Sequence, residues 1–391
     1  MKKARRSSFW GDLNTPHFPP LTESIKTKHL IIGGGISGLS AAYFLLENGE
    51  TDIVILEQGS IGQGSTGHSA GMLICEPETA SWSLFVARYG AASAKKYWDS
   101  QIDALKLVSK IIDTEKIECD FMKQELLLLG NSQAQPHILK DFGSRKKMRS
   151  PSELLSGETL IHELATDAYT VAERVGGSIS VNPLLFAKGF AKYLSTRGVR
   201  IYEKTPFIKK KLAIATTPQG EIQFKNLIRC MGTYEKKTDI KTFLTTISIT
   251  RKLSKKELIS LGLADKDMFF DDERRSYHYG KITGDNRLLV GYGDVRYVNT
   301  HGKPDYVHMP HVRNIERFLR RAFPTIALPL EYSWSARYAL SNTTLPLASI
   351  SQDEVTINGA GTQLASIATA SYAVHKLLKK KHPLDNLFGA K

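Results

Sequence analysis

Three glycines with a fixed spacing stand near the start of the chain. Gly33, Gly35 and Gly38 form the pattern GxGxxG directly after the short apolar run HLII. In such a pattern the first glycine allows a tight turn, the second lets backbone approach a pyrophosphate, and the third lets a helix pack against a strand. Ile36 and Ser37 fall where that helix begins, and its free N–H groups and positive dipole end attract anions. The pattern predicts a binding site for the pyrophosphate of a dinucleotide.

An acidic residue supports the same prediction. Glu57 ends the next apolar run, nineteen residues after Gly38, where a carboxylate accepts hydrogen bonds from the hydroxyls of a ribose. The same carboxylate disfavours a 2′-phosphate, so NADP fits poorly. This unit alone does not decide between FAD and NAD.

The apolar pattern predicts the elements that position these residues. A strand over 30–32, a helix over 37–48 and a strand over 53–56 form a βαβ unit, and the apolar strands are typical of a parallel sheet. Residues 183–202 predict a further helix and strand, and residues 354–380 predict a strand, a glycine turn and a helix. Short strands are also expected at 212–216, 222–224 and 227–230.

A different pattern follows in the middle of the chain. Between Thr242 and Val298 polar and apolar residues alternate, and the Gly-Asp-Asn turn at 284–286 separates two such stretches. This alternation indicates antiparallel hairpins. The sequence therefore predicts an α/β fold with an inserted, mainly antiparallel second domain.

The first residues, 1–27, are predicted to be an irregular arm. Prolines oppose regular structure there, and with polar residues they stand where a signal peptide would be apolar. The long apolar run over 30–46 is broken by the motif glycines, so no transmembrane segment is expected. Cys75, Cys119 and Cys230 form no CxxC pair, which argues against a disulfide framework or a structural metal. A cytoplasmic protein without a metal is predicted.

The chain is basic, with a net charge of +14 from 53 Lys and Arg against 39 Asp and Glu. Such charge suits RNA, anionic lipid or an acidic substrate, or it is solvated surface. The clusters are scattered and lack the interleaved aromatics of a base-reading surface, so no nucleic-acid partner is expected. They lie at Lys2 to Arg6, Arg145 to Arg149, Lys209 to Lys211 and Lys379 to Lys381.

Several further segments follow in a characteristic order, and together they carry a resemblance. The segments are GQGSTGHSAGM (62–72), GGSISVNPLLFAKGFAKYL (176–194), GDNRLLVGYGD (284–294), WSARYALSNTTLPLA (334–348) and NGAGTQLA (358–365). With the N-terminal unit, they make the chain resemble the D-amino-acid-oxidase-like superfamily of flavoproteins. The branch that holds γ-glutamylputrescine oxidase and glycine oxidase looks nearest.

The resemblance implies FAD as the cofactor and a Rossmann-like (GR2-type) FAD-binding domain. An inserted, mainly antiparallel sheet would form the substrate domain. Residues 28–80, 171–240 and 330–381 would then belong to the FAD-binding domain, and residues 81–170 and 241–329 to the substrate domain.

The resemblance also implies which residues contact the cofactor. In the family the segment like GSTGHSAGM passes beside the flavin, where small residues let the backbone lie close to the ligand. His68 stands where some relatives attach FAD covalently, but Gly67 replaces the tryptophan of those relatives, and many relatives have no attachment. Non-covalent FAD is therefore expected, and a covalent link through His68 is the alternative. The implied cofactor-binding residues are Gly33, Gly35, Ile36, Ser37, Gly38, Glu57, Gln58, Gly64, Ser65, Thr66, His68, Ser69, Ala70, Gly71, Met72, Gly232, Gly359, Gly361, Thr362 and Gln363.

The implied activity is oxidation of a primary or secondary amine, or of an amino acid, at its C–N bond. A hydride passes to flavin N5 and leaves an imine. Tyr277 and Tyr279 would share one face of a strand, and Tyr279 falls at a position that is often aromatic in relatives. The arginine that holds a substrate carboxylate in relatives corresponds to Tyr338, with Arg337 one residue early. Tyr279, Tyr338 and Arg337 are the predicted catalytic residues, and the sequence does not identify the electron acceptor, for which oxygen and a quinone are the candidates.

Two other functions stay open at this point. One branch of the superfamily modifies tRNA, and the positive charge would suit RNA. The other alternative is an FAD-binding protein without catalysis, because the family's usual GHG-like triplet is replaced here by Thr362, Gln363 and Leu364.

Overall fold

The computed structural model describes residues 8–12, 17–77, 81–235, 239–264, 268–271, 276–297, 307–343 and 345–388. Much of the predicted N-terminal arm, residues 1–7 and 13–16, lies outside the described residues, and so does the basic cluster Lys2 to Arg6.

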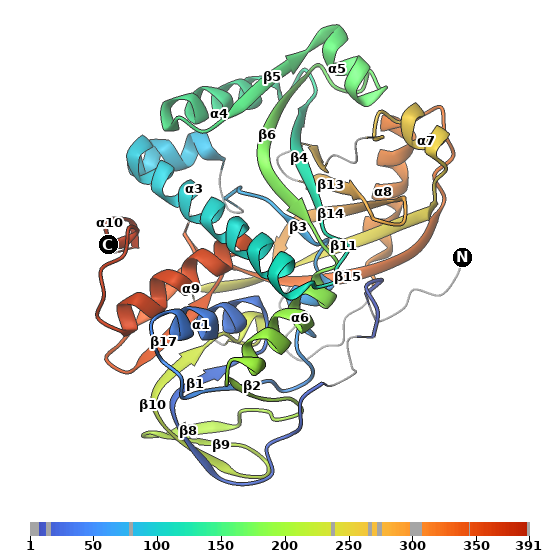
Figure 1. Cartoon of the computed structure of the whole chain (residues 1–391). Helices are drawn as coiled ribbons and strands as arrows, with labels where there is room; N and C mark the ends of the chain where they lie inside the picture. The colour runs from blue at the N-terminus through green and yellow to red at the C-terminus, as the bar shows by residue number, and fades with distance from the viewer. Residues whose placement is uncertain are drawn as a thin grey trace.

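A mainly parallel sheet forms the lower half of the molecule in Figure 1. Its strand order is β16 (Leu347–Ile350), β17 (Glu354–Asn358), β10 (Glu221–Arg229), β1 (Ile25–Ile32), β2 (Ile53–Leu56) and β7 (Arg200–Tyr202). Only β16 runs antiparallel on this path, and the short strands β8 (Lys209–Lys211) and β9 (Ile214–Thr216) extend β10 as an antiparallel ribbon. Strands β1 and β2 are buried along most of their length, as expected for a sheet covered on both faces.

A second sheet is mainly antiparallel. Its order is β15 (Leu330–Ser341), β11 (Ile240–Lys252), β14 (Arg287–Tyr297), β13 (Ser276–Ile282), β12 (Met268–Asp271), β4 (Met122–Gly130), β6 (Val171–Ser180) and β3 (Met72–Leu73), with β5 (Ser152–Ser156) paired to β6. Strands β12 and β4 pair in parallel. The edge strand β3 connects this sheet to the candidate site, because β3 directly follows the GSTGHSAG segment in the sequence.

Helices α1 (Ile36–Glu47), α6 (Pro183–Thr196) and α9 (Gln363–Leu377) lie on the upper side of the parallel sheet in Figure 1, and α3 (Trp82–Glu115) crosses above them. Local sequence explains two of the starts. The side chain of Asn182 accepts hydrogen bonds from the first turn of α6, and that of Thr362 accepts one from Ala365 in α9. The other helices are α2 (Ser65–His68), α4 (Gln135–Met148), α5 (Gly157–Leu164), α7 (Lys255–Ser260), α8 (Met309–Ala322), α10 (Asp385–Phe388) and the 3₁₀ turn η1 (Gly232–Tyr234).

The predicted α/β fold is confirmed, while several element boundaries are corrected. The expected strands 222–224 and 227–230 are one strand, β10, because its parallel register with β1 continues through Asn226, whose amide contacts the ring of His29. The expected strand 212–216 is a hairpin that turns at Leu212, where φ is 51°. The first strand, β1, starts at Ile25, three residues before Lys28, where the regular structure was predicted to begin.

The predicted domain boundaries divide the second sheet. Strands β6 and β15, which the sequence interpretation places in the FAD-binding domain, pair within the mainly antiparallel sheet. The segment 81–170, predicted as part of a sheet-rich domain, also contains the long helix α3, which kinks at Gly90. The division into domains therefore stays a prediction.

Candidate functional site

A groove opens where the parallel strands β1, β2, β10 and β17 end. We call it the dinucleotide groove. It is lined by the predicted catalytic residue Tyr338 and by twelve of the predicted cofactor-binding residues, namely Gly33, Gly35, Ile36, Ser37, Glu57, Gln58, Gly64, Ser65, Thr66, Gly232, Gly359 and Gly361. Ligands of open parallel sheets bind outside the carboxyl ends of the strands, so the groove lies where the fold predicts a nucleotide.

The glycines of the motif have the close contacts that their spacing predicts. Gly33 has φ of 110°, and a Cβ atom there would lie 2.3 Å from the carbonyl oxygen of Cys230. A Cβ atom on Gly38 would lie 1.9 Å from the carbonyl oxygen of Gly33. Gly38 therefore lies outside the groove lining and permits the contact of α1 with β1, which is the packing role of a third glycine.

Glu57 lies at the end of β2 with its carboxylate held by backbone. The N–H groups of Gly34 and Gly59 each donate to one of its oxygens at 2.8 Å. Burial raises the pKa of Glu57; these two hydrogen bonds oppose the shift, and the nearby Glu203 adds to it. The carboxylate has lone pairs left for ribose hydroxyls, since each oxygen can accept two hydrogen bonds.

Thr66 connects the nucleotide end of the groove to a second cavity. Its Oγ1 accepts a hydrogen bond of 3.1 Å from the backbone N–H of Ile36, in the first turn of α1. Thr66, Ile36, Ser65 and Gly361 line both cavities. The two cavities therefore adjoin each other, and we call them together the channel.

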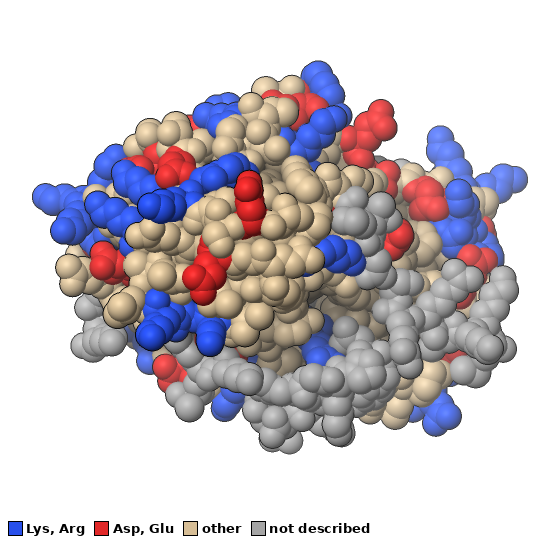
Figure 2. All heavy atoms as spheres, turned by 90° about the horizontal axis from the view of Figure 1, so that it is seen from below, with Lys and Arg blue, Asp and Glu red and all other residues tan. Residues whose placement is uncertain are grey.

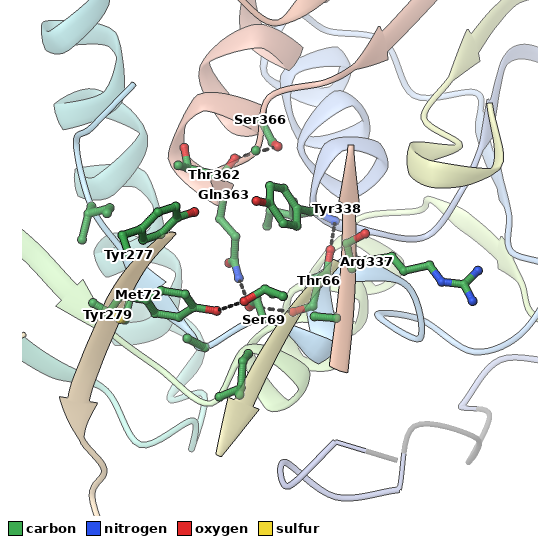
Figure 3. Close-up of a pocket in the computed structure, with 18 residues that line it drawn as sticks. Thr66, Ser69, Met72, Tyr277, Tyr279, Arg337, Tyr338, Thr362, Gln363 and Ser366 are labelled. Atoms are coloured by element: carbon green, nitrogen blue, oxygen red, sulfur yellow. Dashed lines mark hydrogen bonds between the residues drawn. The ribbon is translucent and has the colours of Figure 1, made fainter. Parts of the chain in front are cut away.

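The second cavity, which we call the tyrosine pocket, is mainly apolar and aromatic (Figure 3). The other predicted residues that line it are Ser69, Ala70, Met72, Tyr279, Arg337, Tyr338, Thr362 and Gln363. Its lining also includes Tyr277, Thr245, Ile247, Ile74, Ala336 and Ser366.

Two glycines of β14 make room for the tyrosines of β13. Tyr279 pairs with Gly291, where a Cβ atom would lie 2.0 Å from the Tyr279 ring, and Tyr277 pairs with Gly293, where it would lie 2.5 Å from the Tyr277 ring. Both rings therefore lie across the neighbouring strand, with their centroids 6.0 Å apart. The hydroxyl of Tyr279 is fixed by Thr245 Oγ1 at 2.7 Å. The alternating Tyr and Gly residues thus build an aromatic wall, in which the two rings are tilted by 40° to each other.

The predicted catalytic pair on β15 is separated by strand alternation. In Figure 3 the ring of Tyr338 points toward Thr362 and Ser366, whereas the side chain of Arg337 extends away from the other labelled residues. Successive side chains on a strand point to opposite faces. The structure thus brings Tyr279 and Tyr338 together at the pocket but not the guanidinium of Arg337.

Gln363 connects two segments that are far apart in the sequence. Its Nε2 donates to Ser69 Oγ at 2.8 Å. Its Oε1 is buried and has no hydrogen-bond partner among the residues that the structure describes. A buried acceptor without a donor is costly, so this oxygen fits a bound molecule that brings an N–H group into the pocket.

Two further predicted contacts lie outside the lining of both cavities. His68 Nδ1 lies 3.0 Å from the carbonyl oxygen of Gly64. Gly71, with φ of 68°, packs against the backbone of Val181. The covalent link through His68 stays an alternative, and the site as a whole stays a prediction.

Sequence reasoning did not find several residues of the channel. Pro206 and Phe207 enter the groove from the β7–β8 connection, and Tyr234 enters it from η1. Ser366 reaches both cavities from the first turn of α9. Only Ser366 had a readable signal, because it is one helical turn after Thr362 and lies on the same face of a helix already assigned to the site.

The residues of the channel fit FAD. The N-terminus of α1 and the closely packed glycines would meet a pyrophosphate, Glu57 would meet a ribose, and the flavin would lie toward the adjoining apolar pocket with the unpaired acceptor of Gln363. In the part of the chain that the structure describes, none of the helices is both long enough and apolar enough to cross a membrane.

Comparisons with known proteins agree with this geometry. The profile of a family described as FAD dependent oxidoreductase matches residues 28–370. The chain is 27% identical to gamma-glutamylputrescine oxidoreductase of Escherichia coli (strain K12) over 348 residues, which cover 84% of this chain and 78% of the relative. Its fold is similar to glycine oxidase from Geobacillus kaustophilus, with a TM-score of 0.77 and 16% identity, covering 91% of this chain and 96% of that one. Its fold is also similar to L-proline dehydrogenase from P. horikoshii, with a TM-score of 0.76 and 15% identity, covering 95% of this chain and 97% of that one. The length of the family match, together with the channel that the fold builds, shows that this chain belongs to the DAO family of FAD-dependent oxidoreductases.

Proposed function

We propose that this enzyme oxidises an amine or amino acid at the C–N bond, with the tyrosine pocket as the substrate site. The observation that carries the proposal is that the dinucleotide groove and the aromatic pocket adjoin each other and share Thr66 in their linings. Bound FAD supplies the hydride acceptor for the carbon next to nitrogen. Two relatives, gamma-glutamylputrescine oxidoreductase and glycine oxidase, are named for nitrogen compounds, which supports a nitrogen compound as substrate.

The side chains of the pocket have two tasks in this proposal. The rings of Tyr277 and Tyr279 offer flat apolar surface on which the substrate's carbon chain is held. An apolar surrounding disfavours a charged ammonium and lowers its pKa. The pocket therefore favours the neutral amine, which is the form that gives up a hydride.

The test is anaerobic reduction of the purified yellow protein with a panel of primary amines, secondary amines and amino acids. We expect at least one class to bleach the flavin absorbance. We also expect Gly293→Ala to slow this bleaching, because the new Cβ atom displaces the ring of Tyr277. Gly143→Ala is the matched control, since a Cβ atom there meets no heavy atom within 4 Å.

A flavin that no compound in the panel bleaches would contradict the proposal and favour an FAD-binding protein without amine chemistry. Equal bleaching rates in both glycine variants would indicate that the substrate does not bind against the tyrosine wall. Reoxidation of the bleached protein with oxygen or with a soluble quinone then identifies the electron acceptor.

A further inference from the structure

The N-terminal arm contacts the segment beside the tyrosine pocket. Trp10 is buried, with 7% of its surface exposed. Its indole Nε1 donates a hydrogen bond of 2.7 Å to the carbonyl oxygen of Ser69. A residue of the arm thus holds the backbone of a residue that lines the pocket.

Three carbonyl groups of the 68–71 segment are held by donors from outside it. The indole of Trp334 donates to the carbonyl of His68 at 2.9 Å, Trp10 donates to that of Ser69, and the buried ammonium of Lys281 donates to that of Gly71 at 3.2 Å. The donors come from β15, the arm and β13. These three donors form what we call the 68–71 clamp.

The clamp extends into the pocket through Ser69. The hydroxyl of Ser69 accepts the hydrogen bond from Gln363, whose amide oxygen is the unpaired acceptor of the pocket. A displacement of the Ser69 backbone would therefore move Gln363, and both residues line the cavity. This connection makes the arm relevant to what binds there, beyond its contribution to the core.

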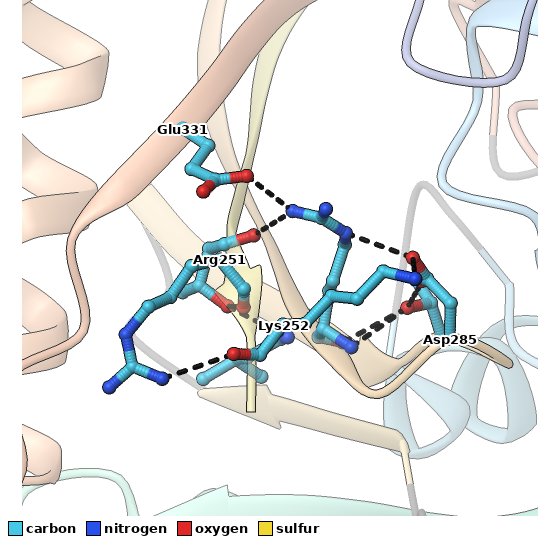
Figure 4. A network of polar contacts seen from close by, with 8 residues as sticks. Arg251, Lys252, Asp285 and Glu331 are labelled. Carbon is cyan, nitrogen blue, oxygen red and sulfur yellow. Dashed lines mark hydrogen bonds and ion pairs between the residues drawn. The ribbon is translucent and has the colours of Figure 1, made fainter. Parts of the chain in front are cut away.

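Charged groups of the second sheet fix the arm in turn. Lys281 Nζ lies 5.1 Å from the centroid of the Trp10 ring, and the guanidinium of Arg287 lies 5.5 Å from that of Phe9. Arg287 is oriented by Asp285 at 3.0 Å and Glu331 at 2.6 Å. Figure 4 labels both of these acidic residues in the polar network. The arm is thus docked on a surface that is itself held in place.

We propose that Trp10 is a positioning residue of the flavin site: its indole N–H fixes the 68–71 segment so that FAD meets a preorganised pocket. Without this donor the segment must be ordered when FAD binds, and that ordering weakens binding. One hydrogen bond of this kind corresponds to an about three- to tenfold change in an equilibrium constant.

The test compares Trp10→Phe with Trp98→Phe. Both changes remove the N–H of a buried indole, but Nε1 of Trp98 has no hydrogen-bond partner among the described residues and lies on α3. The purified holoenzyme is diluted, and FAD release is followed by the rise of free flavin fluorescence. We expect Trp10→Phe to release FAD about three- to tenfold faster than wild type, with an altered visible flavin spectrum, and Trp98→Phe to match wild type.

Two outcomes would overturn the proposal. One is unchanged FAD release and spectrum in a folded Trp10→Phe protein. The other is an equal loss of thermal stability in the FAD-free and FAD-loaded forms with no faster release, which would make Trp10 purely structural. If Trp10→Phe does not fold, Phe9→Leu tests the positioning of the Trp10 indole, because the partly buried Phe9 ring lies 5.9 Å from the Trp10 ring and packs between Arg287 and Trp334. Loss of this ring loosens the indole that donates to Ser69. Unchanged FAD release in that variant would likewise overturn the proposal.

Discussion

One buried lysine of this protein, Lys281, has a strongly lowered pKa. Lys281 is buried, with 2% of its surface exposed, and its ammonium donates to the carbonyl oxygens of Gly71 and Val181. Burial lowers its pKa from 10.5 to about 7, although the nearby Asp120 and Cys119 oppose the shift. A positive charge at this position therefore costs stability, whereas the Lys281 nitrogen has N–H donors for Gly71 in either protonation state.

This lowered pKa predicts a pH-dependent stability. Between about pH 7 and pH 10.5 the unfolded chain binds a proton at Lys281 that the folded chain does not, so the free energy of unfolding rises with pH in this window. In Lys281→Met this rise should disappear. Urea unfolding at about pH 7 and about pH 10 measures it, and Lys123→Met, at an exposed position on β4, is the control. A wild-type and a Lys281→Met protein with the same pH dependence would refute the prediction.

At the residue scale, the sequence identifies a candidate site residue only where its role follows from local spacing. Gly33, Gly38 and Glu57 were found because their roles follow from spacing within one βαβ unit. The contacts of Trp10 and Phe207 could not be found, because each comes from a segment that meets the site only through tertiary packing. Strand alternation did flag Arg337 as one residue out of place, and Figure 3 shows its side chain extending away.

At the scale of elements, the site depends on how closely α1 approaches β1. Gly38 is the contact point, because its missing side chain leaves the carbonyl oxygen of Gly33 in place. The strength of the apolar pattern explains which elements the sequence predicted well. Strands and helices with a strong apolar pattern, such as β2 and α6, were found close to their observed bounds. The long helix α3 was missed because no motif marks it.

Gly38→Ala should therefore damage both the fold and the nucleotide end of the groove. The added methyl forces α1 and β1 apart, and overpacking of this kind costs about 1–3 kcal/mol. We expect a lower urea midpoint together with less FAD per protein after purification. Gly143→Ala, in the open surroundings of α4, should lower neither quantity. Full FAD content in Gly38→Ala would show that the groove tolerates a shifted helix.

At the scale of the whole molecule, the positive charge does not form one surface. On the face shown in Figure 2, Lys and Arg side chains lie on both sides with acidic side chains between them. One of the predicted basic clusters is also partly internal, since Arg145 is fully buried and contacts Glu76 at 2.5 Å and Glu173 at 3.0 Å. Arg145 is therefore unavailable to an external partner, which corrects its inclusion in a surface cluster.

This distribution predicts weak and nonspecific binding of RNA. Scattered charges release counterions without reading bases, so affinity should fall steeply with salt and should not depend on sequence. Filter binding of a tRNA and of a random RNA of equal length, at two salt concentrations, measures this. A salt-resistant preference for the tRNA would revive the tRNA-modifying alternative.

The hydrogen bond between Gln363 and Ser69 has a consequence for biosynthesis. Its two partners are 294 positions apart, so a ribosome has made the nucleotide motif long before it makes the residues that close the pocket. The emerging chain can fold its first βαβ unit early, yet the flavin end of the channel exists only once Gln363 has left the exit tunnel. FAD binding is therefore expected to follow translation of residue 363. Nascent chains that are stalled before residue 363 should contain no bound flavin and should be colourless.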